Sequence, residues 1–226
     1  MSNFTSIKIN VSHKIYLRDP EQTQLGRKII NHSIRLIDEL GFEAFTFKKL
    51  AIRINSTEAS IYRYFESKHH LLVYLVSWYW GWLEYQIDYQ THNIASAEQR
   101  LRIIIKILVE MLKKESNFSY INESALHRII ISESTKAYHT KNVVLEDENG
   151  FFGSYKVLCE KIARVISEIN PNYPYPRALA STLLEVGHQQ IFFAQYLPVM
   201  TEFKVNQDNY ISILNYLEEL IFRQLR

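Results

Sequence analysis

The sequence predicts an all-α protein with an N-terminal three-helix helix-turn-helix domain followed by a larger helical bundle. Apolar residues recur at spacings of three and four through most of the 226 residues, which is the period of an amphipathic helix. Only six glycines and five prolines occur, and they fall between the periodic stretches, as expected for long helices. We expect an N-terminal extension over residues 1–18, the helix-turn-helix domain over 19–67 and the second domain over 68–226.

The first helix is expected to begin at Asp19 and to end at Gly41. Asp19 is a good N-cap, and Pro20 suits the first helical position because its missing N–H is not needed there. Gly41 stops the helix, since glycine readily takes the left-handed angles of a helix C-terminus. Between them lies an expected buried stripe of Leu25, Ile29, Ile30, Leu36, Ile37 and Leu40. This helix should support the two short helices that follow.

Residues 46–68 read as two short helices joined by a tight turn. Thr46 caps the first helix, and Asn55-Ser56 forms the turn because asparagine tolerates left-handed backbone angles. Thr57 caps the second helix, which is expected to end near Phe65. The arrangement is a helix-turn-helix, whose second helix enters the major groove of DNA.

The second short helix determines which side chains should face DNA. At 100° per residue, Ile61 and Phe65 point toward the core, while Ala59 and Arg63 lie on the opposite side. A small residue at 59 permits close approach to the groove, and Arg63 can pair with guanine or with a phosphate. The candidate DNA contacts are Thr46, Thr57, Ala59, Ser60, Tyr62, Arg63, Tyr64 and Lys68.

Three of these candidates have a second interpretation. The hydroxyls of Tyr62 and Tyr64 could reach phosphates, and Lys68 would lie in the first turn of the next helix, where backbone N–H groups attract anions. Alternatively, all three side chains are simply half-buried or solvated. The sequence leaves both interpretations open.

The stretch from Arg27 to Leu72 resembles the N-terminal DNA-binding domain of the TetR family of transcriptional regulators. The matching residues are Gly41-Phe42, Thr46, Leu50-Ala51, Thr57, Ile61-Tyr62, Tyr64-Phe65, Ser67-Lys68 and Leu71-Leu72. The family usually has Gly-Val where this chain has Asn55-Ser56, so the turn lacks one small core contact. The resemblance covers about a fifth of the chain. It implies a homodimer, and a helix that connects the DNA-binding domain to a ligand-binding and dimerisation domain.

The charge distribution agrees with a DNA-binding N-terminal end. Residues 1–75 contain 11 Lys and Arg against 7 Asp and Glu, whereas residues 76–226 contain 15 against 17. The basic end holds the helix-turn-helix, as phosphate contacts require. Residues 1–18 could form an arm that touches the minor groove. We favour a disordered tail or a short segment packed against its own domain.

Six further helices are expected after the helix-turn-helix, at residues 68–91, 97–114, 117–132, 150–169, 177–196 and 209–225. The polar stretch 133–149 reads as a loop with at most a short helical turn. Residues 170–176 contain three prolines and therefore form a linker that is not helical.

The helix over residues 68–91 is unusually rich in Trp and Tyr. Its aromatic side chains either fill the core between the two domains or line a ligand cavity, and the sequence favours neither interpretation over the other. The candidate ligand-binding residues, chosen for aromatic or polar character on bundle helices, are Trp82, Tyr85, Tyr89, Met111, His127 and Phe192.

The helix over residues 177–196 is a candidate for a two-fold interface, together with the helix from Phe152 to Ile169. Small residues such as Ala180, Ser181 and Gly187 interleave with its apolar side chains and let helices approach closely. A dimer also fits the motif, because one short reading helix covers only a half-site. The alternative is ordinary packing within one chain.

Other classes of protein are disfavoured. Glu185 and His188 have a spacing found in di-iron bundles, but the only other such pair, Glu66 and His69, lies in the helix-turn-helix. The single Cys159 has no histidine at local spacing and reads as a buried structural thiol. No signal peptide and no membrane-spanning stretch are predicted, so we expect a cytoplasmic protein without catalytic activity, metal or cofactor.

The sequence therefore predicts a homodimeric transcriptional regulator, with double-stranded DNA carrying a palindromic operator and an unidentified small molecule as its partners. We expect a repressor that its ligand releases from DNA. The alternative is a helical ligand-binding or scaffold protein whose DNA-binding domain no longer functions. A helical metal enzyme is a weaker third hypothesis.

Overall fold

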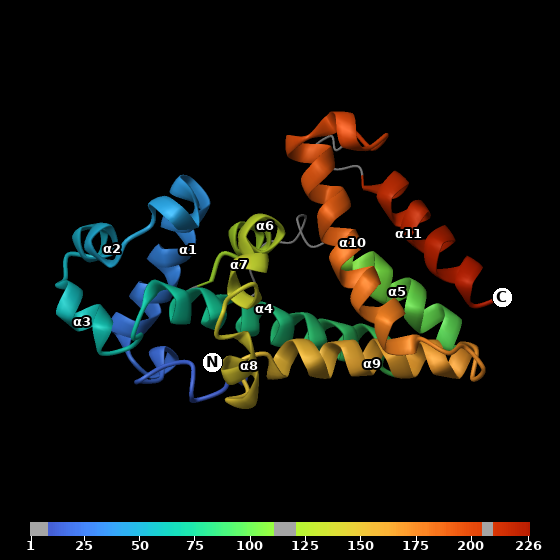
Figure 1. The fold of residues 1–226 in the computed structure, drawn as a ribbon, viewed down its shortest axis with the longest axis horizontal. Helices are drawn as coiled ribbons and strands as arrows, with labels where there is room; N and C mark the ends of the chain where they lie inside the picture. Colours follow the sequence, from blue (N-terminus) through green and yellow to red (C-terminus); the bar gives the residue numbers. More distant parts are fainter. Residues whose placement is uncertain (1–8, 111–120, 205–209) are drawn as a thin grey trace, which may run out of the picture.

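A computed structural model describes residues 9–110, 121–204 and 210–226, and every regular element in these ranges is helical. The all-α prediction is thus confirmed. In chain order the elements are η1 (Pro20–Gln22), α1 (Gln24–Ala44), α2 (Phe47–Arg53), α3 (Glu58–Tyr62), α4 (Lys68–Thr91), α5 (Ala97–Glu110), α6 (Glu123–Glu133), α7 (Thr135–Tyr138), α8 (Val143–Glu148), α9 (Gly153–Ile169), α10 (Pro176–Tyr196), η3 (Pro198–Met200) and α11 (Ile211–Gln224). The head, made of η1 and α1–α3, lies at one end, and α4 runs from it into the body made of α5–α11 (Figure 1).

The first long helix begins later than the sequence predicts. Asp19 caps η1 instead of α1, because its Oδ1 accepts a hydrogen bond from the N–H of Glu21 at 2.9 Å. Thr23 then caps α1 by accepting the N–H of Gly26 at 2.9 Å. A Cβ atom on Gly26 would lie 2.2 Å from the carbonyl oxygen of Pro20. The close approach of η1 to α1 therefore requires glycine at this position.

Gly41 interrupts α1 where the sequence predicts, although one more helical turn follows to Ala44. Gly41 has φ +76°, and its carbonyl accepts the N–H of Phe45 at 3.2 Å. The predicted stripe is buried at its centre, while Leu25 is half-buried and Leu40 is 43% exposed. The prediction that Leu40 belongs to the buried stripe is therefore wrong, since its side chain lies on the solvent side of α1.

Helix α4 is the central helix of the molecule, and all residues from Leu71 to Trp80 are buried. A helix that is buried on all sides must be surrounded by other elements. In α4 these include α9 and α5, which lie beside its C-terminal part, and α6 (Figure 1). The aromatic residues from Tyr74 to Trp82 therefore fill the core, whereas Tyr85 is half-buried and Tyr89 is exposed.

The body departs from the predicted helix boundaries in two places. Residues 133–149 are largely helical, forming α7 and α8, because Glu146 and Ala137 are buried against the rest of the body. Helix α6 begins after Asn122, whose side chain accepts the N–H of Ala125 at 2.9 Å. The predicted ends of two helices, at 110–114 and 117–122, fall mostly outside the described residues.

The head docks onto the body through α1 and α6. Arg128 of α6 donates to both carboxylate oxygens of Asp38 in α1, at 2.9 and 2.6 Å. Nearby, a carboxylate oxygen of Glu133 accepts the N–H of Phe42 at 3.0 Å. Two charged groups of the body are thus bound to the C-terminal half of α1, which ties any movement of α6 to the head.

The N-terminal extension packs against the protein over the residues that are described. Ile9 and Ile15 are buried, with exposed fractions of 6% and 0%. This outcome agrees with the packed segment that we favoured over a DNA-binding arm. In the described part of the chain, no helix combines the length and apolar character needed to cross a lipid bilayer.

Candidate nucleic-acid interface

The turn between α2 and α3 is closed by its own backbone hydrogen bonds. Asn55 adopts φ +52°, the left-handed conformation that the sequence predicts for it. The N–H of Asn55 donates to Ile52, and the N–H of Ser56 donates to Ala51 at 2.9 Å. This pair of bonds is the Schellman motif, in which glycine is commonest and asparagine is tolerated. Asn55 therefore performs the task for which the TetR family usually has glycine.

Two threonines fix the starts of the short helices. Thr46 Oγ1 accepts the N–H of Lys49 at 3.2 Å, and Thr57 Oγ1 accepts the N–H of Ser60 at 3.2 Å. The hydroxyls of Thr57 and Ser60 are also 2.9 Å apart and share a hydrogen bond. Both threonines are exposed on the surface of the head. Their capping role is clear, and their hydroxyls lie at the edge of the surface that carries α3.

Helix α3 places its side chains on the two sides that the helical period predicts. Ile61 and Phe65 are fully buried, whereas Ala59 and Arg63 are exposed. The helix ends at Tyr62, earlier than predicted. A tighter turn follows it, in which the N–H of Tyr64 donates to the carbonyl of Ile61, three residues earlier, at 2.8 Å.

Glu58 and Tyr62 of α3 are exposed, and so is Arg63, the residue that follows the helix. Tyr62 is 47% exposed, and its ring lies edge-on against Phe47 with 5.0 Å between ring centroids. Arg63 has no ion-pair partner among the described residues, whereas Arg53 donates to both oxygens of Glu39 at 3.2 and 2.8 Å. Arg63 is therefore free to bind an acceptor on another molecule.

Tyr64 and Lys68 are both engaged in contacts within the protein. Tyr64 is 2% exposed, and its hydroxyl shares a 2.7 Å hydrogen bond with Thr23. Lys68 Nζ donates to the carbonyls of Phe42 and Glu43, both at 3.2 Å, at the end of α1. Both side chains hold the head together, since they close the gaps between α1 and the segment after α3. We leave Tyr64 out of the interface for this reason.

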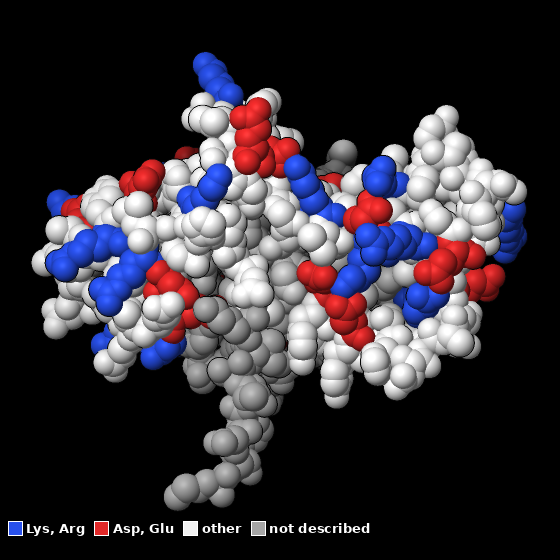
Figure 2. All heavy atoms as spheres, turned by 90° about the horizontal axis from the view of Figure 1, so that it is seen from below, with Lys and Arg blue, Asp and Glu red and all other residues white. Residues whose placement is uncertain are grey.

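The N-terminal part of the chain carries an excess of basic residues, with 11 Lys and Arg against 7 Asp and Glu over residues 1–75. Figure 2 shows both basic and acidic side chains on the head, at the left, and also along the body. Some of these charges pair with one another at both ends, as Arg53 does with Glu39 in the head and Lys161 with Glu84 and Asp88 in the body. The basic excess makes the head the end better suited to a polyanion.

A buried polar cluster lies in the body where α4, α6 and α10 meet. The hydroxyl of Tyr79 is 2.7 Å from Nδ1 of His127 and 3.5 Å from Nε2 of His188. Burial lowers the pKa of both histidines, that of His188 to about 4, so both are neutral at pH 7. Nε2 of His127 and Nε1 of Trp82 are buried without a hydrogen-bond partner in the described structure.

The candidate ligand-binding residues fall into two groups. Trp82 and His127 belong to this cluster, with Trp82 6.3 Å from the ring of Tyr79. Tyr85 and Phe192 are half-buried, and Tyr89 is 71% exposed, so Tyr89 lines no enclosed site here. Met111 lies outside the described residues.

Tyr79 and His188 belong to this cluster but are not among the ligand-binding residues predicted from the sequence. Tyr79 precedes Trp82 by three residues, so the helical period alone would have placed both on one side of α4. His188 was considered only as a metal ligand with Glu185. In the structure Glu185 accepts the hydroxyl of Tyr155 at 2.9 Å, and His188 faces Tyr79. No group of three potential metal ligands occurs among the described residues.

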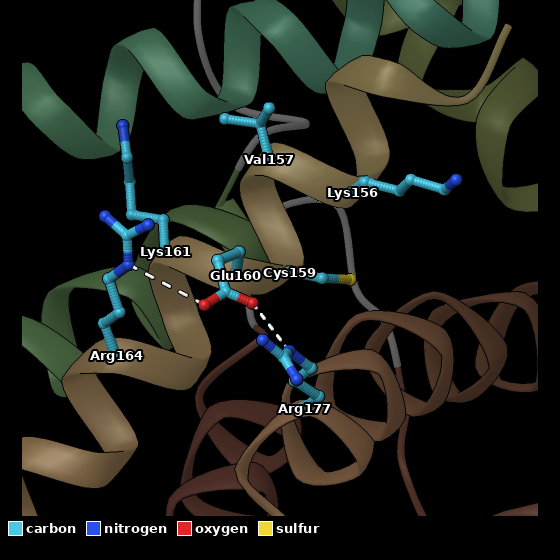
Figure 3. A pocket seen from close by; sticks show the side chains of 7 residues that line it. All are labelled: Lys156, Val157, Cys159, Glu160, Lys161, Arg164 and Arg177. Carbon is cyan, nitrogen blue, oxygen red and sulfur yellow. Dashed lines mark hydrogen bonds and ion pairs between the residues drawn. The ribbon is translucent and has the colours of Figure 1, made fainter. Parts of the chain in front are cut away.

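A surface groove of about 520 Å³ lies between the outer sides of α9 and α10 (Figure 3). Figure 3 shows Glu160 between two arginines, which it pairs with: Arg177 at 2.7 Å and Arg164 at 3.8 Å. Glu160 is the one carboxylate among the lining residues, and the two lysines that line the groove, Lys156 and Lys161, pair with acidic residues outside it. Cys159 also lines it, and burial raises the pKa of its thiol to about 11, which disfavours the reactive thiolate.

The structure combines a helix-turn-helix head with a larger all-helical body. Residues 29–75, which make up most of the head, match the family described as bacterial regulatory proteins, tetR family. This match agrees with the resemblance that the sequence motifs indicate. No curated protein sequence matches the chain significantly.

Several solved structures share the fold over nearly the whole chain. A tetR-family regulator from Rhodococcus RHA1 is 13% identical, with a TM-score of 0.63, covering 90% of this chain and 97% of its own. FadR from Bacillus subtilis, in complex with stearoyl-CoA, is 16% identical with a TM-score of 0.62 and coverage of 86% and 96%. AibR, in complex with isovaleryl coenzyme A and operator DNA, is 16% identical with a TM-score of 0.60 and coverage of 87% and 98%.

Proposed function

We propose that this protein is a homodimeric transcriptional repressor that leaves its operator when a small apolar or aromatic molecule binds in the body. The observation that carries the proposal is the outer side of α3, where Ala59, Tyr62 and Arg63 are exposed on a rigidly capped helix. The DNA contacts we propose are Thr46, Thr57, Ala59, Ser60, Tyr62 and Arg63. Lys68 would join them if DNA draws it away from α1. Such a protein acts in the cytoplasm and needs no catalysis.

The dimer is proposed to form through the outer sides of α9 and α10. Ala178, Ser181 and Thr182 follow one another at helical spacing on α10, and none of them is buried in the monomer. Small side chains of this kind let two helices approach closely. Two copies of α3 would then read two half-sites, which a single short helix cannot do.

The ligand is proposed to act on the polar cluster of Tyr79, His127 and His188. His127 is followed in α6 by Arg128, which is bound to Asp38 of the head. A ligand that displaces the His127 ring would therefore shift Arg128 and the helix it holds. The complexes of AibR and FadR with acyl-coenzyme A molecules support a ligand-binding role for the body in this fold.

Replacing Arg63 with alanine should weaken operator binding by about 5- to 150-fold, the effect of losing 1–3 kcal/mol at a base contact. The loss should be larger on the operator than on random DNA. Fluorescence anisotropy with both DNA types at one salt concentration measures the two affinities. Arg35→Ala is the matched control, because it removes the same charge from an exposed position of α1. Equal losses for the two variants would remove Arg63 from base reading.

One observation favours the alternative of a ligand-binding protein whose head does not bind DNA. Tyr64 and Lys68 are both engaged within the head, which reduces the number of free groups for phosphates. That alternative predicts weak DNA binding without sequence preference, and the same anisotropy measurement distinguishes it from repression.

A further inference from the structure

Residues 9–19, which we call the strap, cross from the body to the head alongside α4. They lie ahead of the DNA-binding domain in sequence, yet they contact the central part of α4, the segment between α8 and α9, and the turn that follows α3. The head and body are also joined by α4 itself, by the contact of α1 with α6, and by an ion pair between Lys136 of α7 and Glu43 of α1 at 3.1 Å. The strap is thus a further mechanical connection between them.

At the body end, Ile9 of the strap packs directly against Gly81 of α4. A Cβ atom on Gly81 would lie only 2.7 Å from Cγ2 of Ile9, so any larger residue at 81 would displace the isoleucine. Glycine in the middle of a helix weakens that helix, and Gly81 therefore has a packing reason to be there. Lys14 adds a second attachment, since its Nζ donates to Oδ1 of Asn149 at 3.2 Å.

At the head end, the strap is bound to the segment directly after the reading helix. The N–H of Leu17 donates to the carbonyl of Tyr64 at 2.8 Å, and the guanidinium of Arg18 lies 5.5 Å from the centre of the Tyr64 ring. Tyr16 packs edge-on against Tyr74 of α4, with 6.0 Å between ring centroids. Since Tyr64 follows α3 by two residues, these contacts fix the position of α3 relative to the strap.

Two glycines leave room for the strap and for the η1 turn that follows it. A Cβ atom would lie 2.7 Å from Ile9 of the strap at Gly81, and 2.2 Å from Pro20 of η1 at Gly26. Both distances are too short for a larger residue, which argues that the packed position of this N-terminal segment is a built-in feature of the fold.

We infer that the strap sets the orientation of the head relative to the body, and thereby the spacing between half-sites that a dimer of this protein accepts. The inference rests on the proposed function, because spacing has meaning only for a dimer that reads two half-sites. In B-DNA an added base pair moves a half-site by about 3.4 Å and rotates it by about 35°. A head held at several points tolerates such changes less than a head held by α4 and α1 alone.

The test uses a series of operators in which the two selected half-sites are moved apart by zero, one, two or three base pairs. The variant is Gly81→Leu, whose side chain would occupy the space that Ile9 fills. The substitution leaves the strap sequence intact and places a good helix former in α4. The matched control is Gly153→Leu, because a Cβ at Gly153 meets nothing within 4 Å. Hydrogen exchange of the Leu17 amide reports whether the strap has left the head.

We expect wild type and Gly153→Leu to lose about tenfold or more in affinity when two base pairs are inserted. Gly81→Leu should lose about threefold or less over the same insertion, and its Leu17 amide should exchange faster. A second variant, Ile9→Asp, should behave like Gly81→Leu, whereas Leu17→Asp should not, because the Leu17 side chain is 59% exposed.

An unchanged spacing profile in Gly81→Leu and Ile9→Asp, with a faster-exchanging Leu17 amide, would overturn the inference, since the strap would then be released without effect. An unchanged exchange rate of the Leu17 amide in Gly81→Leu would also overturn the inference, because the contact of Ile9 with Gly81 would then not hold the strap in place. Failure of the proposed function looks different: wild type itself would then prefer no palindrome at any spacing.

Discussion

Replacing Ala59 with glutamate should abolish specific operator binding, reducing affinity by at least about 100-fold, which corresponds to roughly 2.7 kcal/mol. Ala59 is exposed on the outer side of α3, between the Thr57 cap and Arg63. Glutamate there would place a carboxylate where α3 must approach the groove, close to phosphates and to the acceptor edges of bases. Because the site is exposed, the folded head should be unaffected.

Two further measurements make this prediction specific. The control is Ala95→Glu, which makes the same substitution at an exposed alanine in the loop between α4 and α5, far from the head. Circular dichroism and the unfolding midpoint should match wild type for both variants. If Ala59→Glu retains operator affinity within about threefold, α3 does not approach the groove through this side and the proposed interface is wrong.

Stability should fall steeply when the pH drops from 6.5 toward 4. His127 and His188 are buried, and burial lowers the pKa of both imidazoles, that of His188 to about 4. The unfolded chain protonates these groups below their ordinary pKa of about 6.5. Stability is therefore complete above pH 6.5 and is lost as the pH falls, because the unfolded state then binds more protons.

The expected loss is about 1.4 kcal/mol per pH unit for each buried histidine, and for His188 about 3 kcal/mol between pH 6.5 and 4. Urea unfolding at a series of pH values measures it directly. His188→Phe should remove one histidine's share of the slope between pH 6 and 5. His92→Phe is the control for losing an exposed histidine. A slope that His188→Phe leaves unchanged would show that this imidazole does not stay neutral in the fold.

The head could be predicted from sequence because its signals are local. Thr46 and Thr57 cap the helices they precede, and Asn55 takes the left-handed turn angle, since each depends on bonds within a few residues. The positions of Ile61 and Phe65 follow from the helical period in the same way. The start of α1 was misplaced because Asp19 and Thr23 are both acceptable caps, and each caps a separate turn.

The parts that sequence could not give depend on contacts between distant residues. Tyr64 and Lys68 carry groups that suit phosphates, but Thr23 and the end of α1 lie nearer and bind them. Tyr79 and His188 meet only because α10 crosses α4, an arrangement that no local spacing encodes. The packing of the strap could not be predicted for the same reason, since Ile9 and Gly81 are 72 positions apart in the chain and only the folded structure shows that they are in contact.

Selection of bound fragments from a random DNA pool at physiological salt tests whether this protein is a dimeric DNA-binding regulator. We expect enrichment of a palindrome whose half-site centres lie about one helical turn, roughly 34 Å, or a multiple of it apart. The Ala59→Glu variant, selected in parallel, should enrich nothing. Recovery of no motif by wild type, with only weak and salt-sensitive binding, would contradict the account and favour a ligand-binding protein whose head no longer reads DNA.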